Sequence, residues 1–311
     1  HPDAPDCAGV PAPPSYFGCS PTATLRWDHD YDREAWRLGG NTFTTACGDM
    51  DNDGDMDLVN FEIQHWDVGS SSDATQVLYN DGAAVLHFTR PGVDATGLSR
   101  DWDGKDWNAG DMTGAIFDFD NDGRQDLLIG SSDYPGTRAF LFHQRSDGTF
   151  EEVPAALGID HPRSHGVAVA DLDADGDLDV VLGHGTSRCS GDPSCYATAE
   201  VHAFRNDLGQ DGNWLRIRLE GAAGSNRAAI GARVRVTAGG VTQTREVGGG
   251  YGHLGIQNEL VLHFGLGDAC DVDRVEVRWP DAANTIETFD GVRAIYRIEI
   301  RQGQGAVRYL D

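Results

Sequence analysis

Apolar and polar residues alternate along the last third of the chain. The alternating runs are Leu215–Leu219, Ala232–Val236, Thr242–Val247, Leu260–Phe264, Val275–Trp279 and Ile295–Ile300. A two-residue period places apolar side chains on one face of a strand and Arg or Glu on the other. Strands with one buried face are typical of paired antiparallel sheets. The pattern predicts an antiparallel β-sandwich-like domain over residues 213–311.

A different pattern repeats three times between residues 24 and 212. Each repeat has a short apolar run, at Leu58–Ile63, Leu127–Gly130 and Val180–Gly183. A second alternating run follows in each repeat, at Gln76–Asn80, Ala139–His143 and Glu200–Phe204. Turn residues such as Asn80-Asp81-Gly82 close these runs. About four short strands in each repeat of 50–70 residues is typical of propeller blades. We therefore expect an all-β protein with a partial or small propeller-like array.

An acidic loop precedes the first apolar run of every repeat. The loops begin at Asp49, Asp118 and Asp171, and Gly54, Gly123 and Gly176 occupy loop position 6. Aspartates stand at loop positions 1, 3, 5 and 9, and they are Asp49, Asp51, Asp53 and Asp57; Asp118, Asp120, Asp122 and Asp126; and Asp171, Asp173, Asp175 and Asp179. At position 7, a main-chain carbonyl of Asp55, Arg124 or Asp177 adds another oxygen. Oxygen ligands at this spacing suit Ca²⁺, so we expect about three calcium sites.

These loops differ from EF-hands. An EF-hand closes with a bidentate Glu at position 12, where this chain has Asn60, Ile129 and Leu182. The flanking residues are apolar and partly β-branched, which favours strands over helices. We expect each cation to hold a strand–loop–strand corner in place.

The motif Asp-x-Asp-x-Asp-Gly-x-x-Asp-Leu/Val resembles the FG-GAP/VCBS repeat, the Ca²⁺-binding blade of integrin-type propellers. The resemblance implies calcium at each loop. It also implies closure with about seven blades, whereas residues 24–212 supply about three. An open array leaves strand edges unpaired. They are either available to another chain or covered by the second domain or by the N-terminal arm.

The C-terminal region resembles the ASPIC/UnbV module, which commonly follows VCBS repeats. The residues that carry this resemblance are Asn213-Trp214-Leu215, Ser225-Asn226-Arg227, Ile230-Gly231-Ala232, His263–Gly267 and Val277–Pro280. The module implies no catalytic role.

The net charge of −26 makes the chain strongly acidic. Such a surface repels nucleic acid and anionic membranes, and no apolar run approaches the roughly 20 residues of a membrane span. The chain begins at His1, as a mature chain does after signal-peptide removal, although other boundaries look the same. Calcium loops and six cysteines favour an oxidising setting, so we expect an extracellular, secreted or cell-surface protein.

The cysteines stand at positions 7, 19, 47, 189, 195 and 270. The spacing of Cys189 and Cys195 predicts a local disulfide, and Cys7 and Cys19 could bracket the proline-rich arm of residues 1–23. Cys47 and Cys270 then remain, either bridged or as buried thiols. The arm is either a tail tied down by a disulfide or a segment that docks on another subunit.

Motifs for catalysis or for cofactors are sparse. Gly250–Gly255 fits a dinucleotide-binding spacing, but no helical pattern follows it, so we interpret it as a bend between strands. His161-Pro-Arg-Ser-His165 is interpreted as part of an entering strand. Asp101–Trp107 combines acids with two tryptophans, which suits an additional cation loop, a packed insertion or a sugar site. We identify no catalytic or cofactor-binding residues.

Three functions stay open at this point. We favour a calcium-binding structural or adhesion protein that self-associates, including into fibres, or that binds an extracellular protein or glycan. The alternatives are an extracellular carbohydrate-active enzyme, which needs two carboxylates outside the acidic loops, and a monomeric glycan- or protein-binding module.

Overall fold

The computed structural model describes residues 41–65, 73–84, 86–100, 108–209, 212–222 and 224–310. The arm of residues 1–23 and the segment Asp101–Trp107 lie outside these residues. Strands dominate the described part of the chain, where the helix α1 covers only Val93–Thr96. None of the sheets closes into a barrel. The all-β expectation is therefore confirmed.

The first two repeats form antiparallel blades. Blade 1 has the strand order β1-β2-β3-β4, with β5 added to β2. Its strands are β1 (Thr42–Gly48), β2 (Asp57–His65), β3 (Gln76–Asn80), β4 (Phe88–Thr89) and β5 (Asn108–Gly110). Blade 2 consists of β6 (Gly114–Phe117), β7 (Asp126–Ile129), β8 (Phe140–Gln144) and β9 (Phe150–Val153).

The third repeat forms an incomplete blade. It consists of β10 (Ser164–Ala170), β11 (Asp179–His184) and β12 (Glu200–Phe204). No described strand pairs with the outer edge of β12, the position that β4 and β9 occupy in the other blades. Among the described residues that follow β12, no strand forms before the second module begins at Asn213.

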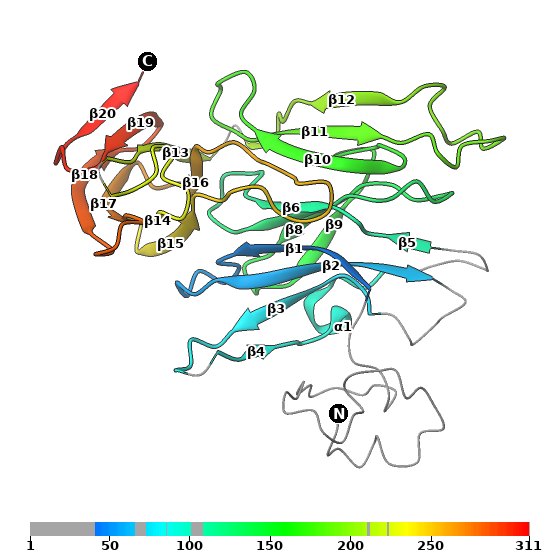
Figure 1. The fold of residues 1–311 in the computed structure, drawn as a ribbon, viewed down its shortest axis with the longest axis horizontal. Helices are drawn as coiled ribbons and strands as arrows, with labels where there is room; N and C mark the ends of the chain where they lie inside the picture. The colour runs from blue at the N-terminus through cyan, green and yellow to red at the C-terminus, as the bar shows by residue number, and fades with distance from the viewer. Residues whose placement is uncertain are drawn as a thin grey trace, which may run out of the picture.

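The blades stack in an open array, with β1, β6 and β10 adjacent along its inner side (Figure 1). The burial of strand β7 explains why the short apolar runs of the repeats do not alternate between apolar and polar residues. Leu127 and Ile129 join the core between blades 1 and 2, and Leu128 joins the core between blades 2 and 3. A strand between two blades buries both faces, so both sets of side chains are apolar.

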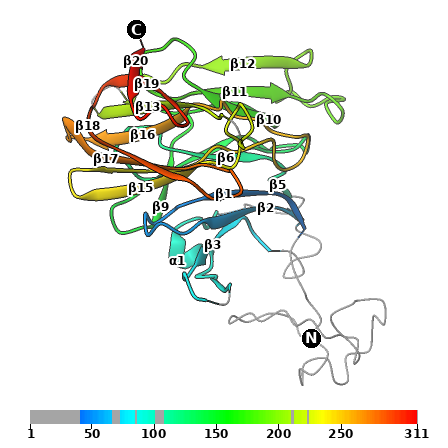
Figure 2. The ribbon, with the colours of Figure 1, turned by 60° about the vertical axis from the view of Figure 1, so that its left-hand side comes forward.

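The second module is a sandwich of two four-stranded sheets that lies beside the stacked blades (Figure 2). The sheet order β16-β13-β19-β20 faces the order β15-β14-β17-β18. The strands are β13 (Asn213–Glu220), β14 (Arg233–Ala238), β15 (Val241–Glu246), β16 (Leu262–Gly267), β17 (Asp271–Arg278), β18 (Ile286–Arg293), β19 (Tyr296–Arg301) and β20 (Val307–Leu310). The core between the sheets includes Trp279, Phe264 and Ile298.

The sandwich differs from the expected one in two respects. Strand β19 pairs with β13 in parallel, whereas we expected antiparallel pairing throughout. Strands β18 and β20 were not expected at all. Both are edge strands; β18 buries only Phe289 and Val292, and β20 buries none of its residues. Their apolar periodicity is correspondingly weak.

A long glycine-rich segment between β15 and β16 reaches from the sandwich to the inner strands of all three blades (Figure 1). The Tyr251 hydroxyl donates to the Gly114 carbonyl at 3.0 Å, and the His253 N–H donates to Thr44 Oγ1 at 2.9 Å. The Val169 N–H donates to Asn258 Oδ1 at 3.0 Å, and the Glu259 N–H donates to the Val169 carbonyl at 3.2 Å. The second module therefore covers the inner strands, which was one of the two alternatives left open.

Candidate cation sites in the acidic loops

The three acidic loops share one backbone conformation. They connect β1 to β2, β6 to β7 and β10 to β11. Position 4 is left-handed in each loop, with φ of 58° at Asn52, 61° at Asn121 and 64° at Ala174. The glycines at position 6 also have positive φ, from 89° to 99°. Glycine adopts this conformation without steric cost, and it turns the chain so that the carboxylates lie close together.

The position 9 aspartate closes every loop in the same way. Asp57 accepts hydrogen bonds from the Met50 N–H at 2.7 Å and the Asn80 N–H at 2.8 Å. Asp126 and Asp179 accept from the corresponding N–H groups, those of Phe119 and Gln144 and of Leu172 and Asn206. This carboxylate therefore joins the start of the loop to the end of the third strand. The spacing identified the residue but not this structural role.

Position 5 has an equally regular contact. Asp53 and Asp122 each accept the N–H of the position 7 residue at 2.8 Å, and Asp175 accepts it at 3.2 Å. The position 7 residues Asp55, Arg124 and Asp177 thus lie directly beside position 5. Asp177 is buried, and its carboxyl interacts with that of Asp175.

Carboxylate oxygens converge within each loop. Three ligand atoms lie within 4.8 Å of one another in each of the groups Asp49, Asp51 and Asp53; Asp118, Asp120 and Asp126; and Asp171, Asp173 and Asp179. Asp49 Oδ2, Asp120 Oδ1 and Asp171 Oδ1 are buried without a hydrogen-bond partner. Because unpaired buried carboxylate oxygens are costly, the residues fit a hard cation. Ca²⁺ would be held by these carboxylates and would neutralise their mutual repulsion.

The pKa values of the loop carboxyls reflect this crowding. Burial raises the pKa of Asp57 to about 7, and burial and the neighbouring Asp122 raise the pKa of Asp118 to about 7. Burial and Asp175 raise the pKa of Asp177 to about 8. Desolvation also raises the pKa of five other loop carboxyls, those of Asp49, Asp51, Asp120, Asp126 and Asp171. Without a cation, these acids therefore retain protons to unusually high pH.

The second loop has two basic neighbours. Arg124 forms an ion pair with Asp122, and its Nε donates to the Gln144 carbonyl at 2.7 Å. His143 Nε2 lies 3.1 Å from Asp120 Oδ2 and 3.3 Å from Asp122 Oδ2. Arg124 therefore neutralises part of the carboxylate charge of this loop.

The sandwich packs directly onto the acidic loops. Arg216 of β13 is buried and pairs with Asp171 of the third loop and with Glu259. Arg245, next to the Phe264 ring, interacts electrostatically with Asp118, Asp49 and Asp126. Burial lowers the pKa of Arg245 only to about 10, so it stays charged at neutral pH. The sequence analysis did not single out Arg216 or Arg245. Each occupies a polar position in an alternating strand, as the exposed arginines do.

Asn121, at position 4 of the second loop, joins both modules and is buried. Its amide nitrogen donates to the Gly209 carbonyl at 2.9 Å and the Gly176 carbonyl at 3.3 Å. His263 Nε2 lies 2.6 Å from Asn121 Oδ1, and the Gly267 N–H donates to the Asn121 carbonyl at 2.8 Å. Burial lowers the pKa of His263 to about 3, so the ring is neutral and donates this bond. Sequence reasoning missed Asn121 as well.

A cavity of about 560 Å³ lies between the inner strands and the sandwich. Glu246 and Glu259 line it and lie outside the acidic loops, as the enzyme alternative requires. Each of them is paired with an arginine, Glu246 with Arg233 at 3.5 Å and Glu259 with Arg216.

Cysteine expectations are partly confirmed. Cys189 and Cys195 form the expected disulfide. The expectation that Cys47 and Cys270 are bridged or buried is wrong, because both are free and exposed. Gly250–Gly255 forms a bend closed by a bridge between Tyr251 and Ile256, as interpreted from the sequence. Of the segment His161–His165, only Ser164 and His165 belong to a strand.

The architecture defines an all-β protein in which blades with acidic loops are joined to a β-sandwich. Family models match the chain in both parts, the FG-GAP-like repeat at residues 118–182 and the ASPIC and UnbV domain at residues 222–307. The chain thus contains an FG-GAP-like repeat and, C-terminal to it, an ASPIC and UnbV domain.

Similar proteins include cartilage acidic protein 1 from Homo sapiens and from Mus musculus, both 32% identical over 171 residues, and from Xenopus tropicalis, 33% identical. The alignments cover 53% of this chain and 24% of each relative, so the chain spans about a quarter of their length. A solved structure of a candidate cell adhesion protein from Bacteroides uniformis aligns with 87% of this chain and 90% of its own, at 13% identity and a TM-score of 0.20. Among the described residues, no helix is long and apolar enough to cross a membrane.

Proposed function

We propose that the chain is an extracellular, calcium-binding structural or adhesion protein that associates with copies of itself. The observation that carries the calcium part is the threefold repetition of one loop geometry with unpaired buried carboxylate oxygens. In this proposal, Ca²⁺ holds the corner between the first two strands of each blade. It also stiffens the surface on which the sandwich packs.

Calcium binding is tested by thermal unfolding in millimolar Ca²⁺ and in chelator. Asp53→Ala, Asp122→Ala and Asp175→Ala each remove a position 5 carboxylate, and we expect each to lower the melting temperature in Ca²⁺ and to change it little in chelator. Asp273→Ala, on the exposed surface of β17, is the matched control. Equal destabilisation in both conditions would show that the loop carboxylates do not bind calcium.

The extracellular and adhesive part of the proposal has separate support. The relatives are named as acidic proteins of cartilage, and this chain carries a net charge of −26. One of its cysteine pairs is oxidised, as is typical of exported proteins.

The free edge of β12 is the proposed surface for self-association. Val201 is the second residue of β12 and is 73% exposed, and no described strand pairs with this edge. An exposed edge with an apolar residue readily adds a strand from another chain. The occupant we propose is β12 of a second copy, because no strand of the described residues pairs with this edge and every molecule presents the same one.

Sedimentation velocity in Ca²⁺ and in chelator tests this association, with negative-stain imaging of the same samples. We expect oligomers in Ca²⁺ that Val201→Lys dissociates. Leu157→Lys is the control, because Leu157 is 71% exposed but lies in a turn. A monomer under all conditions would exclude self-association and leave binding of an extracellular protein or glycan as the adhesive role.

The cavity between the modules supports a second candidate function, a carbohydrate-active enzyme that uses Glu246 and Glu259. Turnover of extracellular polysaccharides is the assay. Loss of that turnover in Glu246→Gln would favour the enzyme. Full turnover in this variant would exclude Glu246, and Asp103→Asn would then test the acidic segment outside the described residues.

A further inference from the structure

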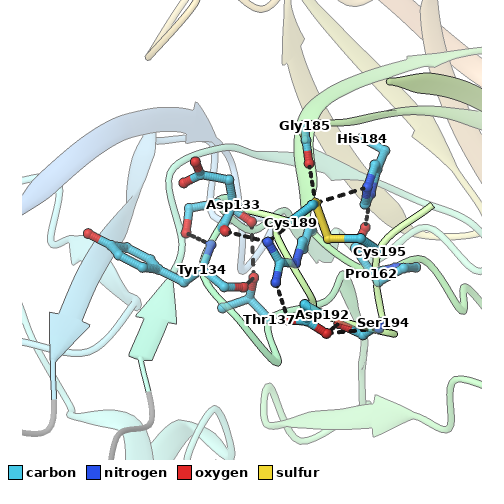
Figure 3. The surroundings of a disulfide bond; sticks show 12 residues. Asp133, Tyr134, Thr137, Pro162, His184, Gly185, Cys189, Asp192, Ser194 and Cys195 are labelled. Carbon is cyan, nitrogen blue, oxygen red and sulfur yellow. Dashed lines mark hydrogen bonds and ion pairs between the residues drawn. A yellow bond between two sulfur atoms is a disulfide. The ribbon is translucent and has the colours of Figure 1, made fainter. Parts of the chain in front are cut away.

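The disulfide loop of blade 3 places an imidazole and a guanidinium group against one sulfur atom (Figure 3). The loop connects β11 to β12, and Cys189 and Cys195 have Cα atoms 5.7 Å apart. His184, at the end of β11, is 4% exposed, and its Nε2 lies 3.9 Å from Cys189 Sγ. The site belongs to none of the acidic loops.

Hydrogen bonding determines which nitrogen of His184 carries the proton. Nδ1 lies 2.9 Å from the Pro162 carbonyl, and a carbonyl oxygen can only accept. The Nδ1–H therefore donates, and in the neutral ring Nε2 has a free lone pair directed at the sulfur. A histidine whose other nitrogen donates to a main-chain carbonyl is oriented as metal-binding histidines are.

Arg163 lies beside the same sulfur atom and would stabilise a negative charge on it. Its side chain is fully buried, and its Nη1 donates to the Asp133 carbonyl at 2.9 Å and to Cys189 Sγ at 3.5 Å. Its Nη2 forms an ion pair with Asp192 in the disulfide loop. A neighbouring guanidinium favours the thiolate over the thiol, so a reduced Cys189 would be a good metal ligand.

We propose that reduction of the Cys189–Cys195 disulfide converts this loop into a binding site for a thiophilic divalent cation such as Zn²⁺. His184 Nε2, Cys189 Sγ and Cys195 Sγ lie within 4.8 Å of one another. Two thiolates and one imidazole are a common zinc ligand set, with a fourth position open to water. Side-chain rotation at the two cysteines is enough to separate the sulfur atoms around an ion.

The reaction balances with a dithiol or phosphine as the reductant. A dithiol supplies two electrons and two protons and becomes a disulfide, or a phosphine and water supply them and give the phosphine oxide, while the Cys189–Cys195 bond breaks and two thiols form. Zn²⁺ then displaces the two thiol protons to solvent and takes both thiolates and His184 Nε2 as ligands. In the reverse direction a small-molecule disulfide is the oxidant: its S–S bond breaks to give two thiols, the Cys189–Cys195 bond forms again and the ion is released.

His161 offers a further nitrogen close to this site. Ser164 Oγ donates to the His161 carbonyl at 2.9 Å, so it must accept the bond from His161 Nδ1–H, which is 2.7 Å long. His161 Nε2 is therefore unprotonated, and it is buried without a hydrogen-bond partner. The His161 and His184 ring centres are 6.1 Å apart.

Cobalt spectroscopy on the full chain tests the proposal. Cys7, Cys19, Cys47 and Cys270 are replaced by Ser so that no other thiol contributes, and calcium is kept saturating. After reduction with a phosphine, Co²⁺ should produce a thiolate-to-cobalt charge-transfer band that saturates at one equivalent and that Zn²⁺ abolishes. The oxidised protein should show no such band.

His184→Ala should weaken cobalt binding roughly tenfold or more, whereas His202→Ala is the control, because His202 Nε2 pairs with Glu200 at 2.9 Å. A second readout uses no variant of the ligands: Zn²⁺ should slow alkylation of reduced Cys189 and Cys195, as mapped by mass spectrometry. Absence of the charge-transfer band, or equal alkylation rates with and without Zn²⁺, would overturn the proposal.

Discussion

The carboxylates of one acidic loop have different structural roles. Position 9 carboxylates accept two main-chain N–H groups that are far apart in the sequence, as Asp57 does from Met50 and Asn80. At position 5, Asp53 accepts the N–H of Asp55, two residues ahead, on an exposed turn. The same residue type is therefore structural at one position and available to a ligand at the other.

Asp57→Ala should destabilise the protein whether or not calcium is present. It leaves two N–H groups without their acceptor, at a cost of about 1–3 kcal/mol for each one that stays buried. Asp53→Ala should cost a comparable amount only in Ca²⁺. Urea unfolding of both variants in Ca²⁺ and in chelator measures this difference. An Asp57→Ala protein as stable as the parent in chelator would contradict the structural role.

The raised pKa values predict opposite pH dependence with and without calcium. Asp57, Asp118 and Asp177 have pKa values of about 7, 7 and 8 in the folded chain, against about 4 when unfolded. The folded state therefore binds more protons between these values. In chelator, the free energy of unfolding should consequently fall as the pH rises from 6.5 to 8.

Calcium should abolish or reverse this trend, because it stabilises the ionised carboxylates and competes with protons. Urea unfolding at pH 6.5 and at pH 8 in each condition measures it. The lowered pKa values of His161 and His263 act in the opposite direction, but they contribute only near pH 6.5, the unfolded value, and less than the three carboxyls. Asp177→Asn mimics the protonated acid and should flatten the dependence in chelator. An unchanged slope in this variant would contradict the role of Asp177.

At the scale of elements, the glycine-rich segment between β15 and β16 was recognisable only as a bend. Its contacts with β1, β6 and β10 show that it fastens the sandwich to the blades. Its two tightest turns, at Gly252 and Gly255, have nearly equal φ of 64° and 65° but different surroundings. A Cβ on Gly252 would lie 2.4 Å from Thr44 Cγ2, whereas nothing lies within 4 Å at Gly255.

Gly252→Ala should therefore destabilise the protein more than Gly255→Ala. Both substitutions carry the similar cost of a left-handed residue, about 1 kcal/mol, but only the first forces β1 and the segment apart. The extra loss should be about 1–3 kcal/mol, the usual cost of overpacking. Thermal unfolding of both variants measures it, and limited proteolysis should cut the segment faster in Gly252→Ala. Equal losses would mean that the segment does not pack tightly on β1.

At the scale of the whole molecule, two separately packed modules meet through a charged junction. The sandwich has its own core, and the blades share two others. Arg216 is the centre of the junction, because it neutralises Asp171 of the third loop and Glu259 of the glycine-rich segment together. A cation held by the third loop, as we propose, would therefore act on the same loop as this arginine.

Arg216→Gln should be strongly destabilising, because it leaves two carboxylates at the junction without their counter-ion. Breaking a buried pair in this way costs about 3–5 kcal/mol. Arg274→Gln is the control, since the pair of Arg274 with Asp290 is exposed and should contribute little. Calorimetry should show the modules of Arg216→Gln unfolding in separate transitions. One unchanged transition would show that the junction does not couple them.

The sequence by itself determined the local features of this protein. Period-two runs identified six of the eight sandwich strands, and three copies of one motif located the acidic loops and the strands that leave them. These features depend on residues within about ten positions of one another, through side-chain alternation and the left-handed turn at glycine. The sequence did not predict the edge strands β18 and β20 or the parallel pairing of β13 with β19. These features produce little or no periodicity of apolar residues.

Only the tertiary structure decided what surrounds the loops. Arg216 reaches Asp171 across 45 positions, and His263 reaches Asn121 across 142. On their own strands Arg216 and Arg218 occupy the same kind of polar position, yet the first is buried and the second is exposed. That difference arises because the two modules pack against each other, and packing between distant segments has no signature in either segment alone.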